Sequence, residues 1–183
     1  KPVEMQKIEE KISQKRQQFQ EELDRLQEER DSISDKVSFK QTLLYETGDE
    51  LVTAVIETLE RLGFDSVVDV DHEEDGDEDN EDIRCEGDPT LLFEVKGLTG
   101  LPSDDEYTEV SKYVLSRRVD SNDFNGQGVT LINHERFKEP KNRGQAFHHD
   151  NARKEAERTG IALLTTWDLY RLLQNYERLN WSI

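Results

Sequence analysis

Two charged residues, Glu94 and Lys96, lie within the otherwise apolar run TLLFEVKG at residues 90–97. Alternate side chains of a β-strand point to opposite faces, so Leu92, Glu94 and Lys96 would share one face. Because the run is apolar on both faces, it predicts a strand that is covered on both sides of a sheet. Burying two charges is costly without partners, so the pair indicates a functional site. The alternative is an ordinary ion pair at a strand end, which contributes little energetically.

A third charged residue, Asp82, begins the short segment DIRCE, which a tight turn joins to the strand of Glu94. Neighbouring strands lie about 5 Å apart, so the carboxylates of Asp82 and Glu94 can approach each other at one sheet edge. Two carboxylates at that distance repel unless a proton or a cation lies between them. Few, anionic oxygen ligands suit Mg²⁺ or Mn²⁺, and the backbone carbonyl of Val95 would be a natural further ligand. The alternative is that Asp82 simply belongs to the acidic loop before it.

Lys96 has two roles open to it beside such a metal ion. It can orient or deprotonate an attacking water, and it can offset the negative charge of a pentavalent phosphorane. These residues therefore predict metal-assisted hydrolysis of a phosphodiester. Asp82, Glu94 and Lys96 are the expected catalytic residues, and Mg²⁺ or Mn²⁺ is the expected cofactor.

The same residues resemble the PD-(D/E)xK nuclease superfamily, which has the restriction-endonuclease-like fold and includes Mrr-type and RecB-like branches. The resemblance rests on Asp82, an 11-residue gap and the sequence Glu94-Val95-Lys96-Gly97, and it covers roughly residues 43–175 in the order of elements. It implies that the Asp and the Glu hold a divalent metal ion and that the Lys assists the attacking water. The proline that gives the superfamily its name is absent before Asp82.

The resemblance also implies accessory residues. A helix before the motif often adds an acid, and here we expect Glu50 as a further metal ligand, in preference to Glu46. The alternative is that Glu50 is an ordinary solvent-facing helix residue. Relatives of the RecB-like branch carry a Gln-x-x-x-Tyr pair on the helix after the motif, and Glu109 and Tyr113 have that spacing on one helix face. Glu in place of Gln departs from the pattern; it could add a metal ligand or could have no function.

The order of elements predicts an α/β domain with a restriction-endonuclease-like mixed sheet and helices on both faces. Apolar spacing and glycine stops indicate helices at residues 44–62, 105–118, 146–160 and 167–179. Short apolar runs indicate strands at residues 64–70, 82–86, 90–97, 129–133 and 161–166. The run DHEEDGDEDNE at residues 71–81 cannot bury apolar surface and predicts a solvated loop.

Residues 3–37 predict a long helix with the narrow apolar stripe of a coiled coil. The apolar residues lie mostly 3, 4 or 7 positions apart, at Met5, Ile8, Ile12, Phe19, Leu23, Leu26, Ile33 and Val37. We expect residues 1–39 to assemble the protein into a homo-oligomer, most simply a dimer, although the residues do not determine the number of strands. Residues 40–183 would then form the nuclease-like domain. The alternative is a single long helix that lies on a larger partner or on a further domain.

The charge of the chain is negative overall but unevenly distributed. The formal net charge is −18, yet residues 71–109 hold 16 acidic and 2 basic side chains, whereas residues 128–183 hold 7 acidic and 9 basic ones. Global acidity argues against nonspecific binding of polyanions. The C-terminal third leaves room for a phosphate-binding surface, and Lys141 and Arg143 in the connection HERFKEPKNRG are the candidate nucleic-acid contacts. The alternative is that this connection is a solvated loop.

Other features exclude some functions and compartments. No apolar run approaches the roughly 20 residues that cross a bilayer, and no signal-peptide pattern opens the chain, so we expect no membrane partner and a cytoplasmic location. The single Cys85 excludes an internal disulfide. Adjacent His148 and His149 would diverge by about 100° on a helix and would not chelate a metal. The chain begins at Lys1 rather than at methionine, so we expect a piece of a longer protein with further domains or subunits.

These features favour a Mg²⁺- or Mn²⁺-dependent endonuclease that hydrolyses DNA. Pairing two such domains through residues 3–37 would place two active sites on one duplex. The resemblance implies settings such as restriction, anti-phage defence or repair. Two alternatives belong to other classes of protein. One is a nuclease-fold module that has lost activity and serves binding or scaffolding, and the other is a coiled-coil assembly protein whose acidic globular end contacts other proteins.

Overall fold

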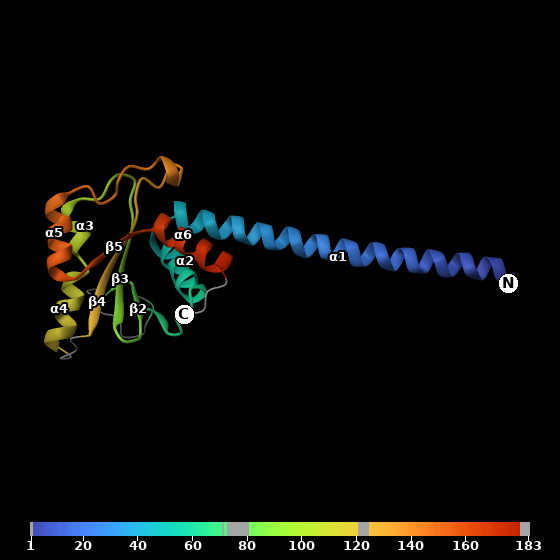
Figure 1. Ribbon diagram of the computed structural model, residues 1–183, viewed down its shortest axis with the longest axis horizontal. Coiled ribbons are helices and arrows are strands. Elements are labelled where there is room, and N and C mark those ends of the chain that lie inside the picture. Colours follow the sequence, from blue (N-terminus) through green and yellow to red (C-terminus); the bar gives the residue numbers. More distant parts are fainter. Residues whose placement is uncertain (1, 71, 73–80, 121–124, 180–183) are drawn as a thin grey trace. The chain divides into compact units, whose positions relative to one another are not determined.

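A computed structural model describes residues 2–70, 72, 81–120 and 125–179 of the protein (Figure 1). The chain divides into two compact units, Lys1–Phe39 and Lys40–Ile183. Most of the predicted acidic loop, at residues 71 and 73–80, lies outside the described residues. Of its two described positions, His72 is exposed but Glu81 is buried. The prediction of a solvated loop is therefore wrong at Glu81.

The first unit belongs to α1 (Val3–Tyr45), a single helix whose last residues lie in the second unit. The predicted long N-terminal helix is therefore confirmed. The large apolar residues of its stripe are all exposed, from 48% for Ile12 to 66% for Phe19. None of the helices in the described part of the chain combines the length and apolarity that a membrane crossing requires.

The structure places a break inside the helix that the sequence predicts over residues 44–62. Leu44 and Tyr45 end α1, and α2 (Gly48–Arg61) begins after Thr47, which has an extended backbone. The last carbonyls of a helix have no partner within it and must find donors elsewhere. The apolar spacing continues through the break, which is why the sequence pattern does not reveal it.

Side chains from far along the chain satisfy the carbonyls at this break. Arg143 Nη2 donates to the carbonyl of Leu44, Arg136 Nη1 to that of Tyr45 at 3.2 Å, and Asn133 Nδ2 to that of Glu46 at 2.9 Å. All three donors come from residues 133–143. Tertiary contacts therefore satisfy the carbonyls at the end of α1.

Within the described residues, five strands form one mixed sheet in the order β1-β2-β3-β4-β5. The strands are β1 (Val67–Asp69), β2 (Ile83–Cys85), β3 (Thr90–Gly97), β4 (Gly126–Asn133) and β5 (Ala162–Thr165). The pairs β1–β2 and β2–β3 are antiparallel, whereas β3–β4 and β4–β5 are parallel. The α/β class and the mixed sheet are therefore confirmed, and β3 has its predicted bounds.

Helices cover both faces of this sheet (Figure 1). One face carries α3 (Asp104–Thr108), α4 (Ser111–Asp120) and α5 (Asp150–Thr159), and the other carries α2 and α6 (Thr166–Leu179). The helix predicted at residues 105–118 is thus divided into α3 and α4. A short 3-10 turn, η1 (Pro140–Asn142), lies in the connection after β4.

The central strand β3 is covered on both faces, as predicted. Leu92 belongs to a buried cluster with Val110 on the α3–α5 face, and Phe93 is also buried. A Cβ atom at Gly128 of β4 would lie 2.9 Å from Val110 Cγ1. Glycine at this position therefore lets the junction of α3 and α4 approach the sheet closely, which brings the start of α4 beside β3.

Candidate active site

The register of the antiparallel ladder brings Asp82 alongside β3. Ile83 pairs with Phe93, so Asp82, one residue earlier, is level with Glu94. Residues opposite each other in an antiparallel pair share a face of the sheet. The Asp82 carboxylate also accepts a hydrogen bond from the Val95 N–H, with the nitrogen 2.6 Å from Oδ2. The structure thus places Asp82, Glu94 and the backbone of Val95 together.

The Glu94 carboxylate is buried in this strand, with 3% of the residue exposed. Burial raises the pKa of Glu94, and the Lys96 ammonium, with Nζ 2.5 Å from Oε1, opposes that shift without cancelling it. The Tyr113 hydroxyl lies close enough to favour the ionised form weakly. Among the described residues, however, no donor reaches Glu94 Oε2 with hydrogen-bond geometry. This buried oxygen has spare acceptor capacity that a cation would satisfy.

Lys96 is held between two carboxylates. Its Nζ lies 2.5 Å from Glu94 Oε1 and 3.0 Å from Glu109 Oε2. Burial disfavours the charged ammonium, but the hydrogen bonds and charges of Glu94 and Glu109 outweigh burial and raise the pKa of Lys96 above its ordinary value. Lys96 is therefore protonated at neutral pH. Of the two roles open to it, the geometry favours charge stabilisation and orientation of water over proton removal.

The predicted accessory residues Glu109 and Tyr113 lie at the same site. Glu109 follows α3 as its C-cap, and Tyr113 is in the first turn of α4. Burial works against ionised Glu109, but Lys96 and Lys112 outweigh it and lower the pKa of Glu109. Burial and the charges of Glu94 and Glu109 raise the pKa of Tyr113, so its hydroxyl stays protonated. Metal binding by Glu109 stays a prediction.

Glu50 is exposed in the first turn of α2. The start of α2 approaches the end of β3, where Thr47 Oγ1 donates to the Gly97 carbonyl at 3.2 Å. Within the described residues, no set of three or more His, Cys, Asp or Glu side chains is arranged to hold a metal ion. Glu50 therefore does not complete such a set with Asp82 and Glu94, and its role as a ligand stays a prediction.

The remaining donors fit a divalent cation in part. Two carboxylates and a backbone carbonyl supply the oxygen ligands that Mg²⁺ and Mn²⁺ prefer. Glu94 Oε2 has capacity for a cation, whereas Oε1 is paired with Lys96 and Asp82 Oδ2 is bonded to the Val95 N–H. Asp82, Glu94 and the Val95 carbonyl are therefore the groups that would hold the ion.

The two candidate nucleic-acid contacts, Lys141 and Arg143, have different environments. Arg143 donates to Asn133 Oδ1 at 2.7 Å, to the Lys138 carbonyl at 3.2 Å and to the Leu44 carbonyl. Each of its three guanidinium nitrogens is thus engaged within the fold, which gives Arg143 a structural role, and its contact with DNA stays a prediction. Lys141 is exposed, and its contact with DNA stays a prediction.

His148 and His149 precede a helix rather than lying in it. α5 begins at Asp150, and His149 is its N-cap with an extended backbone, φ −82° and ψ 110°. The two rings have centroids 4.0 Å apart, and His149 Nδ1 is 3.5 Å from Asp104 Oδ1. The prediction that the two side chains diverge on a helix is wrong, because the helix starts after both of them.

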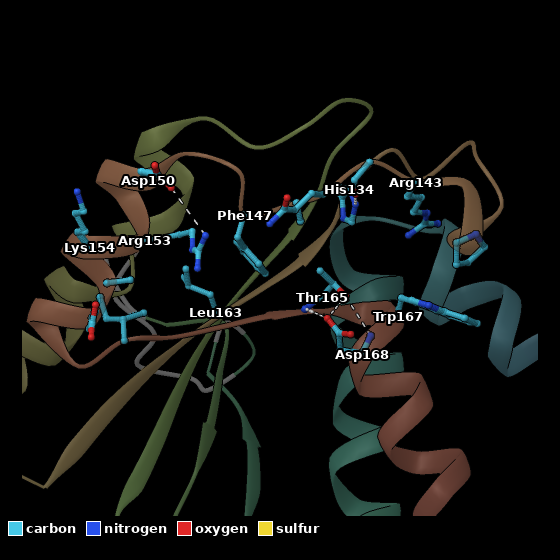
Figure 2. A pocket seen from close by; sticks show the side chains of 17 residues that line it. His134, Arg143, Phe147, Asp150, Arg153, Lys154, Leu163, Thr165, Trp167 and Asp168 are labelled. Atoms are coloured by element: carbon cyan, nitrogen blue, oxygen red, sulfur yellow. Dashed lines mark hydrogen bonds and ion pairs between the residues drawn. The ribbon is translucent and has the colours of Figure 1, made fainter.

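A cavity of about 960 Å³ lies between α5, β5 and the start of α6 (Figure 2). Its lining includes His134, Phe147, Arg153, Leu163, Trp167 and Asp168, and none of the candidate catalytic residues. Sequence reasoning missed this cavity because its lining is scattered over residues 134–168 and converges only in the folded domain. The charge pattern of the sequence does not indicate it either, because the three cations and three carboxylates of its lining balance.

Comparisons with known proteins identify no relative: no family model, no curated protein and no solved structure matches the chain. The candidate site is therefore defined by its residues and their geometry.

Proposed function

We propose that residues 40–183 form a nuclease domain of the PD-(D/E)xK type, which hydrolyses DNA phosphodiester bonds with Mg²⁺ or Mn²⁺. The observation that carries this proposal is the buried carboxylate of Glu94, level with Asp82 and bonded to Lys96 in the central strand. A buried acid with a perturbed pKa beside a specific charge partner is typical of functional sites. The order of elements, with a helix before three antiparallel strands and a parallel strand after a helical pair, agrees with the resemblance.

In this proposal Asp82, Glu94 and the Val95 carbonyl hold the metal ion, which when bound supplies a polarised water and neutralises charge on the phosphate. Lys96 stays protonated and donates to phosphate oxygens, where its charge stabilises the transition state. Glu109 holds the Lys96 ammonium on this face of β3. Each side chain therefore has one role that its observed contacts allow.

Cleavage of plasmid and linear DNA in the presence of Mg²⁺ or Mn²⁺ tests the proposal. Glu94→Ala and Lys96→Ala should each abolish cleavage while the circular dichroism spectrum is retained. Glu86→Ala is the matched control, because Glu86 is an exposed carboxylate on the same hairpin. The proposal is refuted if neither metal promotes cleavage of any nucleic acid and Asp82→Ala leaves metal affinity unchanged.

Residues 3–37 are proposed to join two chains through a coiled coil. The stripe of eight large apolar residues is exposed along this helix, and stripes of this kind are covered by partner helices. A second copy would cover it and would present two nuclease domains to the two strands of one duplex. Restriction, anti-phage defence and repair are the settings that the resemblance implies.

Light scattering on the full chain tests this assembly. Ile12→Asp combined with Leu23→Asp should reduce the measured mass to that of the 21.4 kDa monomer, because two buried charges would interrupt the stripe. Ser13→Asp combined with Gln20→Asp adds the same charges outside the stripe and should leave the mass unchanged. Equal masses for the two double variants would contradict the coiled-coil role.

A second candidate function is a binding or scaffolding module that keeps the fold without activity. It is favoured by the compensation of charge within the site, since Lys96 already bonds Glu94 and Glu109. The lack of a complete metal-binding set among the described residues points the same way. Such a module would show no Mn²⁺ binding by calorimetry and would keep its partner after Lys96→Ala.

A further inference from the structure

The cavity beside β5 brings together groups from four segments (Figure 2). β5 contributes Leu163 and Thr165, α5 contributes Arg153, the loop before α5 contributes Phe147, and the start of α6 contributes Trp167. Its volume of about 960 Å³ lies at the upper end of the range of about 300–1,000 Å³ for small-molecule sites. The cavity is therefore large enough for a ligand of the size of a nucleotide.

An apolar wall lies at the α5 side of this cavity. Leu163 and Phe147 are half-buried, and Leu163 packs against the buried cluster beneath α4 and α5. The Phe147 ring packs against Tyr107 with ring centroids 5.6 Å apart, and the Tyr107 hydroxyl donates to the Ala146 carbonyl at 2.7 Å. These contacts hold the Phe147 ring in place before any ligand arrives.

Arg153 is the cation beside this wall. Figure 2 shows its side chain extending from α5 toward Phe147 and Leu163, whereas Lys154 points away at the outer rim. The Asp150 carboxylate is 3.9 Å from Arg153 Nη1, too far for a hydrogen bond. The planar guanidinium therefore retains donors for an anionic group such as a phosphate.

The charges that line the cavity are balanced, although the chain as a whole carries −18. Three cations face three carboxylates: Arg143, Arg153, Lys154, Asp150, Glu157 and Asp168. Arg143 is bonded within the fold, and Asp168 accepts a hydrogen bond from Thr165 Oγ1 at 2.6 Å. A bare anion such as inorganic phosphate finds little net attraction in such a setting. A ligand that suits the cavity must combine an anionic group with an apolar face.

We infer that this cavity binds one unpaired nucleotide of a DNA strand, with its base against Phe147 and Leu163 and its phosphate at Arg153. Every base has an aromatic face that stacks on side-chain rings, so such binding tolerates different sequences. The phosphate supplies the anionic group for the guanidinium. The choice of DNA as the polymer rests on the proposed nuclease function, whereas the nucleotide chemistry rests on the cavity itself.

The test is a binding titration in EDTA, which removes any contribution from metal-dependent cleavage. A short fluorescein-labelled single-stranded oligonucleotide is titrated with the full-length protein and followed by fluorescence anisotropy. Arg153→Gln and Phe147→Leu should each weaken binding about tenfold, the scale of losing one charge-assisted contact or one stacked base. Arg158→Gln is the matched control, since Arg158 is exposed on the same helix, pairs with Glu155 and does not line the cavity.

The control variant should bind within about twofold of the wild type, as expected for a surface change. Equal affinities of the Arg153→Gln and Arg158→Gln proteins would overturn the inference. Binding of a fully paired duplex as tight as that of the single strand would also overturn it. Competition by a free deoxynucleoside monophosphate distinguishes two sources of the ligand. Displacement identifies a mononucleotide site, and no displacement identifies a site that needs the strand; both support the nucleotide chemistry.

Failure of the nuclease proposal can be distinguished from failure of the cavity assignment. In a Lys96→Ala background, Arg153→Gln should still weaken binding in EDTA, because the two sites share no residue. If the wild type binds through Arg153 but cleaves no DNA in Mg²⁺ or Mn²⁺, the nuclease proposal fails and the cavity assignment holds. If the wild type cleaves DNA while Arg153→Gln changes neither cleavage nor binding, the cavity assignment fails alone.

Discussion

The carboxylate site on β3 and the cavity beside β5 differ in how far apart their residues lie in the chain. Asp82, Glu94 and Lys96 belong to one hairpin, and a single register places them together. The cavity takes residues from a loop, two helices and a strand between residues 134 and 168. A hairpin register follows from the period-two pattern of its strands, whereas a cavity depends on how separate elements pack. This difference determines which of the two sites can be found in the sequence.

The two sites also differ in how their charged side chains are paired. At the carboxylate site, the Lys96 ammonium compensates both the buried carboxylate of Glu94 and the partly exposed carboxylate of Glu109. At the cavity, Arg153 is exposed and its nearby Asp150 is too far for a hydrogen bond. Within the carboxylate site itself, Glu94 and Glu109 share the same ammonium but have pKa shifts of opposite direction. The Glu94 side chain is 3% exposed, and burial there outweighs Lys96; that of Glu109 is 29% exposed, and Lys96 and Lys112 together outweigh burial.

The largest expected effect is that of Glu94→Gln, which separates activity from stability at the carboxylate site. Cleavage should fall by at least about 100-fold, the scale of losing a principal catalytic group. The raised pKa of Glu94 contributes stability that is fully present below the unfolded pKa and lost as pH rises through the folded pKa. Ionised Glu94 thus opposes folding at neutral pH, and the variant should melt above the wild type at pH 7.

Thermal melts across a pH series check this prediction. The difference between the variant and the wild type should shrink as the pH falls toward the ordinary carboxylate value of 4.5. Glu86→Gln, in which the exposed carboxylate of the same hairpin is neutralised, should show neither effect. A lower melting temperature for Glu94→Gln than for the wild type at pH 7 would contradict this prediction. It would mean that the ionised Glu94 carboxylate stabilises the fold.

The next effect concerns the two basic residues of the connection after β4. Arg143→Ala should lower the free energy of unfolding by about 1.5–3 kcal/mol, because it leaves the part-buried Leu44 carbonyl at the end of α1 and Asn133 Oδ1 without their charged donor. Lys141→Ala, an exposed neighbour, should change it by less than about 0.5 kcal/mol. Urea unfolding measures the free energy of unfolding of both variants. Equal losses would contradict a structural role for Arg143 and a solvent-exposed position for Lys141.

The smallest expected effect is that of Glu109→Gln. The lowered pKa of Glu109 contributes stability that is present above the unfolded pKa and lost as pH falls through the folded pKa. The variant should therefore melt below the wild type at pH 7, and the two should converge in acid. Because Glu109 is partly exposed, the cost should be about 0.2–1 kcal/mol. A higher melting temperature for Glu109→Gln than for the wild type at pH 7 would contradict the prediction that ionised Glu109 stabilises the fold and ionised Glu94 destabilises it.

The strand of Glu94 could be predicted closely from its residues, because a covered strand in the middle of a sheet is an apolar run on both faces. The helices were less predictable at their ends. The break after Tyr45 depends on Arg136, Arg143 and Asn133, which lie about 90 or more residues away in the chain. The apolar spacing that marks a helix contains no information about donors from so far along the chain.

In the candidate site, too, some contacts could not be predicted from the sequence because they depend on distant segments. The contact of Glu109 with Lys96 depends on the close approach of the α3–α4 junction to the sheet at Gly128, which spacing alone does not show. The role of Arg143 in the fold was not predictable either. A basic residue in a polar connection has the same sequence pattern whether it faces phosphate or caps a helix.

The sequence by itself determined the long N-terminal helix, the mixed α/β class and the alignment of Asp82 with Glu94, because each follows from a periodic pattern or a short hairpin. The tertiary structure alone decided the contact of Lys96 with Glu109, the inward position of Arg143 and the existence of the cavity at Arg153. These properties depend on burial and on donors from distant segments, and the energies of both are set by packing rather than by neighbours in the chain.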